Sequence, residues 1–103
     1  MNKIKRRWKN LKQLDLAEQK HINCIRVHRG ETPAHRNKKI ELCLNLLDEG
    51  RDFVTEARTM DRSRRYDIYL LDSGDVWEIE TDRDVEKSDS TYTFYVDKYD
   101  GGD

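Results

Sequence analysis

The sequence predicts an α+β fold, of the broad α/β class, with one mixed sheet. The expected order is an N-terminal helix, a second helix, three strands, a short helix and a last strand. Three observations carry this prediction: a clearly capped helix, stretches of alternating apolar and polar residues after it, and a turn signal between two of those stretches. With 103 residues, 35% of them hydrophobic, the chain is expected to form a small domain with a modest core.

The first stretch of the chain is basic. Residues 2–20 carry Ile4, Trp8 and Leu11 at nearly helical spacing, with Lys and Arg between them. This pattern predicts a helix that packs through Trp8 and Leu11. The β-branched residues within 22–27 then predict a short strand.

A second helix is predicted over residues 33–49. Thr32 is a suitable N-cap, Pro33 is tolerated at the first helical position, and Gly50 can end the helix in a left-handed conformation. His35 and Lys39 fall within its wide apolar face. Either these two side chains extend past the end of the core into water, or they point toward the carboxylates of the following strands.

Alternation of apolar and polar residues predicts strands over 51–58 and 91–96, with a short helical stretch over 82–89. In the first of these strands Phe53 is expected on the same face as Ala57, and Glu56 on the other face. Glu56 is therefore a further candidate acid.

The stretch 64–81 predicts a β-hairpin that turns at Ser73-Gly74. Symmetric pairing places Asp67 opposite Glu80, and Glu78 on the same face. Like charges directly opposite each other destabilise a sheet unless a positive group lies between them. Carboxylate oxygens are ligands of Mg²⁺ and Mn²⁺, so Asp67, Glu78 and Glu80 are the candidate metal ligands. The alternative is that these acids only solvate the exposed side of an ordinary hairpin.

Charge is unevenly distributed along the chain. Residues 1–33 carry nine Lys/Arg against three Asp/Glu (+6), residues 34–81 eight against eleven (−3), and residues 82–103 three against seven (−4). A basic arm joined to an acidic centre suits a protein that holds phosphate with one part and a metal with another, although a basic helix face is commonly only solvated. The candidate nucleic-acid contacts lie in the loop before Asp67 and in the first helix: Arg62, Arg64, Arg65, Arg6, Arg7 and Lys9.

Several classes of protein are excluded by composition. No apolar run reaches the roughly 20 residues needed to cross a bilayer, and the N-terminus lacks the apolar core of a signal peptide. Cys24 and Cys43 lack metal-ligand spacing, so both are expected to be reduced packing residues. We therefore expect a cytoplasmic protein without a membrane partner.

The order of these elements resembles the PD-(D/E)XK nuclease superfamily, which includes restriction enzymes and archaeal Holliday-junction resolvases. The resemblance spans residues 33–97 and rests on Asp67 in the second strand and on Glu78-Ile79-Glu80 in the third. More narrowly, the chain looks like the nuclease-like region of competence protein CoiA. The residues concerned are His35-x-x-x-Lys39, Gly50, Glu56, Arg65-Tyr66-Asp67 and Trp77-Glu78-Ile79-Glu80.

The resemblance implies a restriction-endonuclease-like αβββαβ core over residues 33–97 and leaves residues 1–32 as a basic addition. Residues 98–103 are expected to form a flexible acidic tail. The resemblance also implies a metal-dependent DNA endonuclease, in which Asp67 and Glu78 bind Mg²⁺ or Mn²⁺. The third motif position is usually Lys. Here it is Glu80, which would act as a base or an additional ligand.

Two inward residues are expected to contribute to that catalytic site. His35 and Lys39 occupy positions at which resolvases often carry a helix glutamate, and Lys39 would replace the missing lysine from a different element. No base-reading motif is visible, so the DNA substrate is expected to be bound non-specifically or by its structure.

Two further alternatives stay open. The chain could be a catalytically degenerate member of the same fold that acts as a nucleic-acid-binding or assembly module. Tyr92, Phe94 and Tyr95 could form the interface of a homodimer, or they could only cover the core.

Overall fold

The structure is a computed structural model that describes residues 2–81 and 90–96. It confirms the α+β class. Its elements are α1 (Lys3–Leu11), a short 3₁₀ helix η1 (Leu16–Glu18), α2 (Pro33–Asp48), β1 (Phe53–Arg58), β2 (Arg65–Leu70), β3 (Val76–Glu80) and β4 (Tyr92–Tyr95). Among the described residues, no helix is long and apolar enough to cross a membrane.

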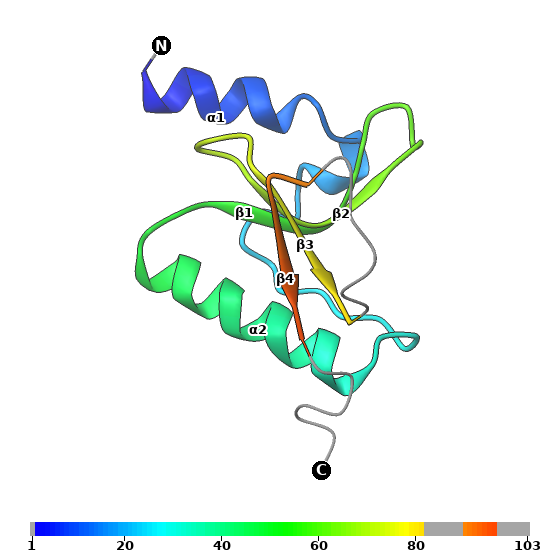
Figure 1. Cartoon of the computed structure of the whole chain (residues 1–103). Helices are drawn as coiled ribbons and strands as arrows, with labels where there is room; N and C mark the ends of the chain where they lie inside the picture. Colours follow the sequence, from blue (N-terminus) through cyan, green and yellow to red (C-terminus); the bar gives the residue numbers. More distant parts are fainter. Residues whose placement is uncertain (1, 82–89, 97–103) are drawn as a thin grey trace.

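The four strands form one mixed sheet in the order β1-β2-β3-β4 (Figure 1). β1 and β2 pair antiparallel, as do β2 and β3, whereas β3 and β4 run parallel. This confirms the mixed sheet. The short helix expected at 82–89 and the tail expected at 98–103 lie outside the described residues.

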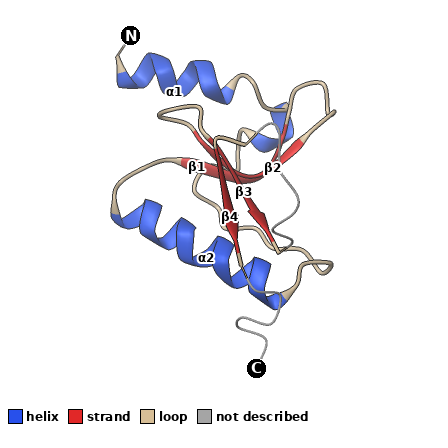
Figure 2. Ribbon diagram, viewed as in Figure 1, coloured by secondary structure: helices blue, strands red, loops and turns tan. Residues whose placement is uncertain are grey.

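The two helices cover opposite faces of the sheet (Figure 2). On the α2 side, Leu46 of the helix lies in one core cluster with Phe53 and Ile68. On the α1 side, Leu11 lies in a second cluster with Val54. Both faces of β1 and β2 are therefore buried, which explains why the sequence of these strands is rich in apolar residues.

The hairpin formed by β2 and β3 has a different register from the predicted one. Tyr69 pairs with Val76 and Ile68 with Trp77, a shift of two residues. The Leu70 N–H donates to the Asp75 carbonyl oxygen (2.9 Å), so residues 71–74 close the loop. This loop is centred one residue before Ser73-Gly74, on which a loop of two or of four residues was expected to be centred. A shift of two changes the neighbour of each side chain on the other strand but leaves Ile68 and Tyr69 on their predicted faces. Asp67 departs from its predicted face, because it contacts His35 of α2 whereas Tyr69 lies in the α1-side core.

Helix α1 ends at Leu11, well before the predicted boundary at residue 20. The helix docks through Leu11, which is buried, and through two polar contacts. Arg7 Nε lies 2.7 Å from an Asp52 carboxylate oxygen, and Asn10 Nδ2 donates to the Leu71 carbonyl oxygen (2.6 Å). The docked face thus combines apolar and polar residues, which a search for an apolar stripe does not detect.

The predicted packing of Trp8 is wrong. Trp8 is 51% exposed and Ile4 is 69% exposed, so these two apolar side chains lie on the solvent side of α1. The next buried apolar residue after Leu11 is Leu14, which is fully buried and forms an isolated bridge to Thr59.

The strand predicted at 22–27 is also absent from the described structure. Residues in this segment instead run beside β1 and use side chains in place of a regular ladder. The Asn23 side chain accepts from the Phe53 N–H (3.0 Å), and Thr55 Oγ1 accepts from the Arg26 N–H (2.9 Å). Asn23 has a φ of 62°, outside the extended region, and this interrupts any continuous pairing. The segment covers part of the outer edge of β1.

Two side-chain predictions are met only in part. Both cysteines are free, but Cys43 is buried and Cys24 is exposed, so only Cys43 packs in the core. Phe94 packs against Trp77 with ring centroids 5.2 Å apart and contributes to the α2-side core, whereas Tyr92 is 60% exposed.

The docking of α1 can be tested by truncating residues on its two sides. We expect Leu11→Ala to lower the free energy of unfolding by about 2–5 kcal/mol, because a buried leucine leaves a cavity. Trp8→Ala should change it by about 0.5 kcal/mol or less, as expected for an exposed position. Guanidinium denaturation followed by circular dichroism measures both. A larger loss for Trp8→Ala than for Leu11→Ala would show that the helix docks through its other face.

Candidate functional site

The candidate site lies where the N-terminal end of α2, the loop of residues 28–32, the start of β2 and the end of β3 meet. A cavity of about 260 Å³ opens there. It is lined by His28, Gly30, Glu31, Thr32, His35, Arg65, Asp67, Ile79, Glu80 and Thr81. Four residues predicted from the sequence therefore line one cavity: His35, Arg65, Asp67 and Glu80.

Asp67 lies at the centre of this group. Its carboxylate accepts from the Ile79 N–H (2.8 Å) and lies 3.4 Å from His35 Nε2, while the Asp67 N–H donates to a Glu78 carboxylate oxygen (3.3 Å). Burial alone raises the pKa of Asp67, but hydrogen bonds with His35, Glu78 and the Ile79 N–H outweigh it and lower the pKa to about 2. Asp67 is therefore ionised at neutral pH.

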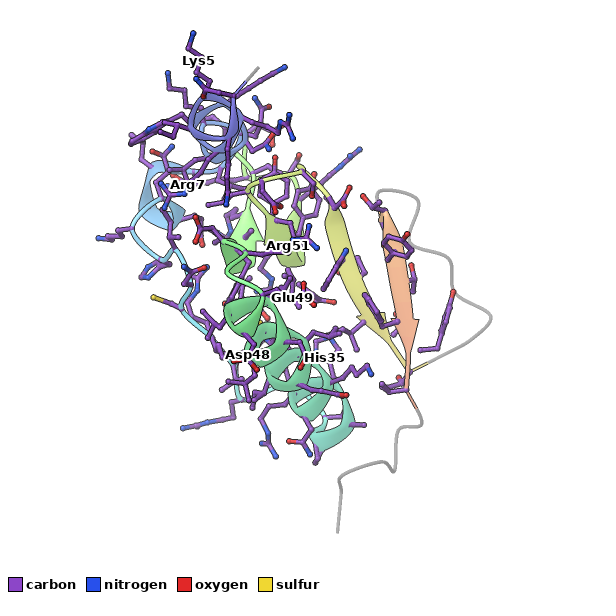
Figure 3. The ribbon with its side chains drawn as sticks, turned by 90° about the vertical axis from the view of Figure 1, so that its left-hand side faces the viewer. Lys5, Arg7, His35, Asp48, Glu49 and Arg51 are labelled. Carbon is purple, nitrogen blue, oxygen red and sulfur yellow. The ribbon has the colours of Figure 1, made fainter. Side chains whose placement is uncertain are left out.

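His35 connects Asp67 to Glu31. Its Nδ1 lies 3.2 Å from a Glu31 oxygen and its Nε2 3.4 Å from Asp67. The hydrogen bond with Asp67 raises the pKa of His35, partly opposed by burial and supported by Glu31. Of the two alternatives left open by the sequence, the structure favours the one in which His35 points toward the carboxylates. Figure 3 shows His35 on α2.

Lys39, one helical turn after His35, has no exposed side-chain surface. Its ammonium bonds to Glu31 and to Glu56, whose Oε1 lies 2.6 Å away. Lys39 thus points inward, as one of the two alternatives predicted. Within the described residues, the ion-pair partners of Lys39 are Glu31 and Glu56, and not the carboxylates of the hairpin. The expectation that Lys39 points toward the hairpin carboxylates is therefore wrong.

Glu56 has an unusual backbone conformation. Its φ is 50°, which is rare for a residue with a side chain in the middle of a strand. The paired residues on either side are Thr55 with Ile68 and Ala57 with Tyr66. The Glu56 carboxylate is held by Lys39 and by Arg65 Nε (3.1 Å). These two ion pairs oppose the cost of the conformation, which is of order 1–3 kcal/mol.

Because of the positive φ of Glu56, the side chains of β1 do not all lie on the faces that the sequence predicted. Phe53 lies in the α2-side core, but Ala57 lies with Val54 in the α1-side core. Simple alternation would place Ala57 with Phe53. The positive φ of Glu56 changes the face that the strand presents after it.

Glu31 is a site residue that the sequence-based search missed. Its side chain is almost fully buried and contacts Lys39 and His35. Burial raises the pKa of Glu31, but the hydrogen bond and charge of Lys39, with a smaller contribution from His35, lower it overall. The signal available was the i, i+4, i+8 spacing of Glu31, His35 and Lys39, which aligns them along one side of a helix. Glu31 precedes the N-cap, so a search limited to the helix does not include it.

Two groups of residues have ligand chemistry for a metal ion. Among the described residues, His28, Glu31 and Glu56 form a group whose donor atoms lie within 4.8 Å of one another. However, the Lys39 ammonium already lies between Glu31 and Glu56 and supplies a positive charge there.

The predicted trio of hairpin acids is arranged differently. Glu78 is buried beside Asp67, and Glu80 lines the same cavity as Asp67, with its carboxylate accepting from the Thr81 N–H (2.9 Å). Within the described residues, these three acids do not form a group as tight as that of His28, Glu31 and Glu56. Mg²⁺ is commonly bound through only one or two carboxylates plus water, so Asp67 and Glu78 fit such a site by their chemistry.

The predicted basic contacts are spread over the molecule. Arg65 lines the cavity, whereas Arg62 is exposed and pairs with Asp15 (2.8 Å). Arg64 lines a different cavity, of about 590 Å³, beside Tyr66 and Tyr69. The α1 residues Arg6, Arg7 and Lys9 lie across the sheet from α2, as the labels of Arg7 and His35 in Figure 3 illustrate. Of the six basic residues, one therefore lies directly at the candidate site.

Comparison of the chain with known protein families, curated proteins and solved structures finds no match.

The buried ion pairs of Lys39 can be tested by Lys39→Met. We expect this substitution to lower the free energy of unfolding at pH 7 by about 3–5 kcal/mol, because it leaves buried carboxylates without their cation. The pKa of Glu31 is below its ordinary value of 4.5 in the folded protein. Its stabilising contribution is therefore present above about pH 4.5 and is lost as the pH falls through the lowered pKa. Thermal melts should differ strongly at pH 7 and less at pH 3.

Lys38→Met is the matched control for this test. Lys38 lies on the same helix and pairs with Glu41 at 3.3 Å, but the Glu41 side chain is 60% exposed. An exposed pair of this kind contributes about 0.5 kcal/mol or less. Equal melting temperatures for Lys39→Met and Lys38→Met at pH 7 would contradict the buried-pair interpretation.

Proposed function

We propose that this protein is a metal-dependent nuclease that hydrolyses phosphodiester bonds in DNA, with a PD-(D/E)XK type of core. The observation that carries the proposal is the state of Asp67. It is ionised, it contacts Glu78 and His35, and it lines the same cavity as Glu80. A carboxylate held charged in a cavity beside further acids is a typical setting for metal-assisted hydrolysis.

The arrangement of elements supports the proposal. Helix α2 is followed by three antiparallel strands and by a fourth strand parallel to the third. The resemblance implies this succession with a further helix before the fourth strand, expected at residues 82–89, which lie outside the described residues. Asp67 lies on the second of these strands and Glu78 and Glu80 on the third, so the acids named by the motif meet at one end of the sheet.

In this proposal Asp67 and Glu78 hold Mg²⁺ or Mn²⁺. When bound, the ion would polarise the scissile phosphate and lower the pKa of water. Glu80 accepts a proton from the attacking water, whose oxygen forms a bond to phosphorus. The bond from phosphorus to the leaving oxygen breaks, and that oxygen takes up a proton from solvent. His35 orients the Asp67 carboxylate.

The role of Lys39 differs from the one that the resemblance implies. Its ammonium is bonded to Glu31 and Glu56, so we assign it a positioning role. It fixes Glu31, which in turn contacts His35. This leaves Glu80 as the residue that directs the water.

One observation favours the second candidate function, a catalytically degenerate module that binds nucleic acid or an assembly partner. The Glu78 carboxylate already accepts from the Asp67 N–H, the Asp67 carboxylate accepts from the Ile79 N–H, and the Lys39 ammonium is engaged elsewhere. With both features, the polar groups of the site have hydrogen-bond or ion-pair partners without a metal ion. Calorimetric titration with Mn²⁺ separates the two functions, because a nuclease binds the ion through Asp67 and Glu78, whereas the module gives no heat.

The nuclease proposal is tested with plasmid, single-stranded and branched DNA in Mg²⁺ or Mn²⁺. We expect Asp67→Asn and Glu78→Gln to reduce the cleavage rate by about a hundredfold or more, because losing several kcal/mol of charge stabilisation costs a factor of ten per 1.36 kcal/mol. A chelator should abolish cleavage, and added Mn²⁺ should restore it.

Asp72→Asn is the control for this assay. Asp72 pairs with Arg51 at 3.0 Å near the hairpin turn and does not line the candidate cavity. Its variant should cleave like the parent. Cleavage that survives in both Asp67→Asn and Glu78→Gln would refute the assignment of the site. Light scattering on the parent also tests the homodimer that double-strand cleavage would require.

A further inference from the structure

A third cavity, of about 270 Å³, adjoins the one that contains Asp67 and Glu80, and three arginines lie in its lining together with two glutamates. It is lined by Glu18, Arg26, Val27, His28, Glu56, Arg58 and Arg65. Three arginines and a histidine thus surround a space that no predicted function uses. We propose that this cavity binds a phosphate group through Arg58 and Arg65, assisted by His28. That the phosphate belongs to a nucleic-acid strand rests on the proposed nuclease function.

The pairing of β1 with β2 brings two of these arginines together. Arg58 and Arg65 are direct partners in the register, at the end of β1 and the start of β2. Like charges opposite each other in an antiparallel pair destabilise it unless an opposite charge intervenes. Both side chains line the cavity, so an anion bound there would relieve their repulsion.

Among the described residues, only one of the two arginines has an ion-pair partner. Arg65 pairs with Glu56 at 3.1 Å. Arg58 is exposed and has no ion-pair partner among the described residues. A guanidinium that is free to reach an anion and presents several donors suits a phosphate oxygen.

The third arginine forms the wall of the cavity. The Arg26 guanidinium bonds to the Glu18 carboxylate and to the carbonyl oxygens of Thr55 and Glu56. Its charge is fixed in place and is largely offset by Glu18. The surplus positive charge therefore comes from Arg58, because the Lys39 and Arg65 cations face the Glu31 and Glu56 carboxylates.

The position of the cavity explains why a phosphate there would matter. His28 and Arg65 line both this cavity and the one that contains Asp67 and Glu80. A strand with one phosphate against Arg58 and Arg65 would extend past Arg65 toward the carboxylates. The basic cavity would then fix the register of the strand, and the acidic cavity would receive a neighbouring phosphodiester.

The experiment uses metal-free protein, so that binding is measured without cleavage. Inorganic phosphate is titrated while the arginine Nε–H resonances are followed by NMR. Binding of a single-stranded oligonucleotide is measured by fluorescence anisotropy at several salt concentrations. We expect phosphate to shift the Arg58 and Arg65 resonances, and the oligonucleotide to displace it.

Arg58→Gln is the variant that decides the proposal. It should weaken oligonucleotide binding roughly tenfold, as expected for one charge-assisted hydrogen-bonded contact. It should also reduce the slope of log K against log salt by about 0.7, the value for one phosphate contact on a single strand. Arg58→Lys should recover part of the affinity. Arg51→Gln is the control, because Arg51 precedes β1, at the end away from Arg58, and pairs with Asp72.

Unchanged Arg58 and Arg65 resonances on addition of phosphate, or equal salt slopes for Arg58→Gln and the parent, would overturn the proposal. Phosphate binding that an oligonucleotide does not displace would overturn its assignment to a nucleic-acid strand. Since none of these measurements needs a metal or turnover, a protein that binds phosphate through Arg58 but cleaves nothing would refute the nuclease function and leave this site in place.

Discussion

The buried ammonium of Lys39 is the interaction on which the candidate site depends. It joins three separate parts of the chain, because Lys39 comes from α2, Glu31 from the preceding loop and Glu56 from β1. An uncompensated buried charge is costly, so the three side chains constrain one another strongly. From Glu31 the contacts continue through His35 to Asp67, and from Glu56 they continue to Arg65. One buried cation thus fixes both the carboxylate cavity and the wall that it shares with the basic cavity.

Local rules predict the regular parts of the fold well. Thr32 caps α2 with its hydroxyl, Pro33 opens the helix, and Gly50 follows it with a φ of 70°. Each of these residues acts through its own backbone, so its effect can be read from a few neighbouring positions. Alternation also predicts the faces in the second half of β2, where Ile68 belongs to the α2-side core and Tyr69 to the α1-side core. It fails at the start of β2, where Tyr66 packs with the α1-side core and Asp67 contacts His35 of α2.

Features that depend on tertiary contacts are the ones that sequence reasoning missed. The hairpin register depends on how four residues close a turn, and Ser73-Gly74 is compatible with more than one closure. Helix α1 docks through Arg7 and Asn10 as well as Leu11, and the polar contacts have no periodic signal. Glu31 belongs to a loop, where no repeat constrains the direction of a side chain. Its i, i+4, i+8 spacing with His35 and Lys39 becomes informative once Lys39 is known to be buried.

Carboxylates that face each other across a pair of strands repel unless a cation lies between them, and this constraint applies to β1 and β2 as well as to the hairpin. The register of β1 and β2 would place Glu56 directly opposite Asp67, which is the same kind of unfavourable pair. The positive φ of Glu56 avoids this arrangement. It turns the Glu56 carboxylate to Lys39 and Arg65, while Asp67 bonds to the Ile79 N–H and contacts His35. A strain of order 1–3 kcal/mol therefore separates two carboxylates that a regular strand would oppose. The Glu56 carboxylate is paired with Lys39 and Arg65, whereas Asp67 lines an open cavity. Asp67 and Glu80 are therefore the strand acids that line the cavity in which a ligand can bind.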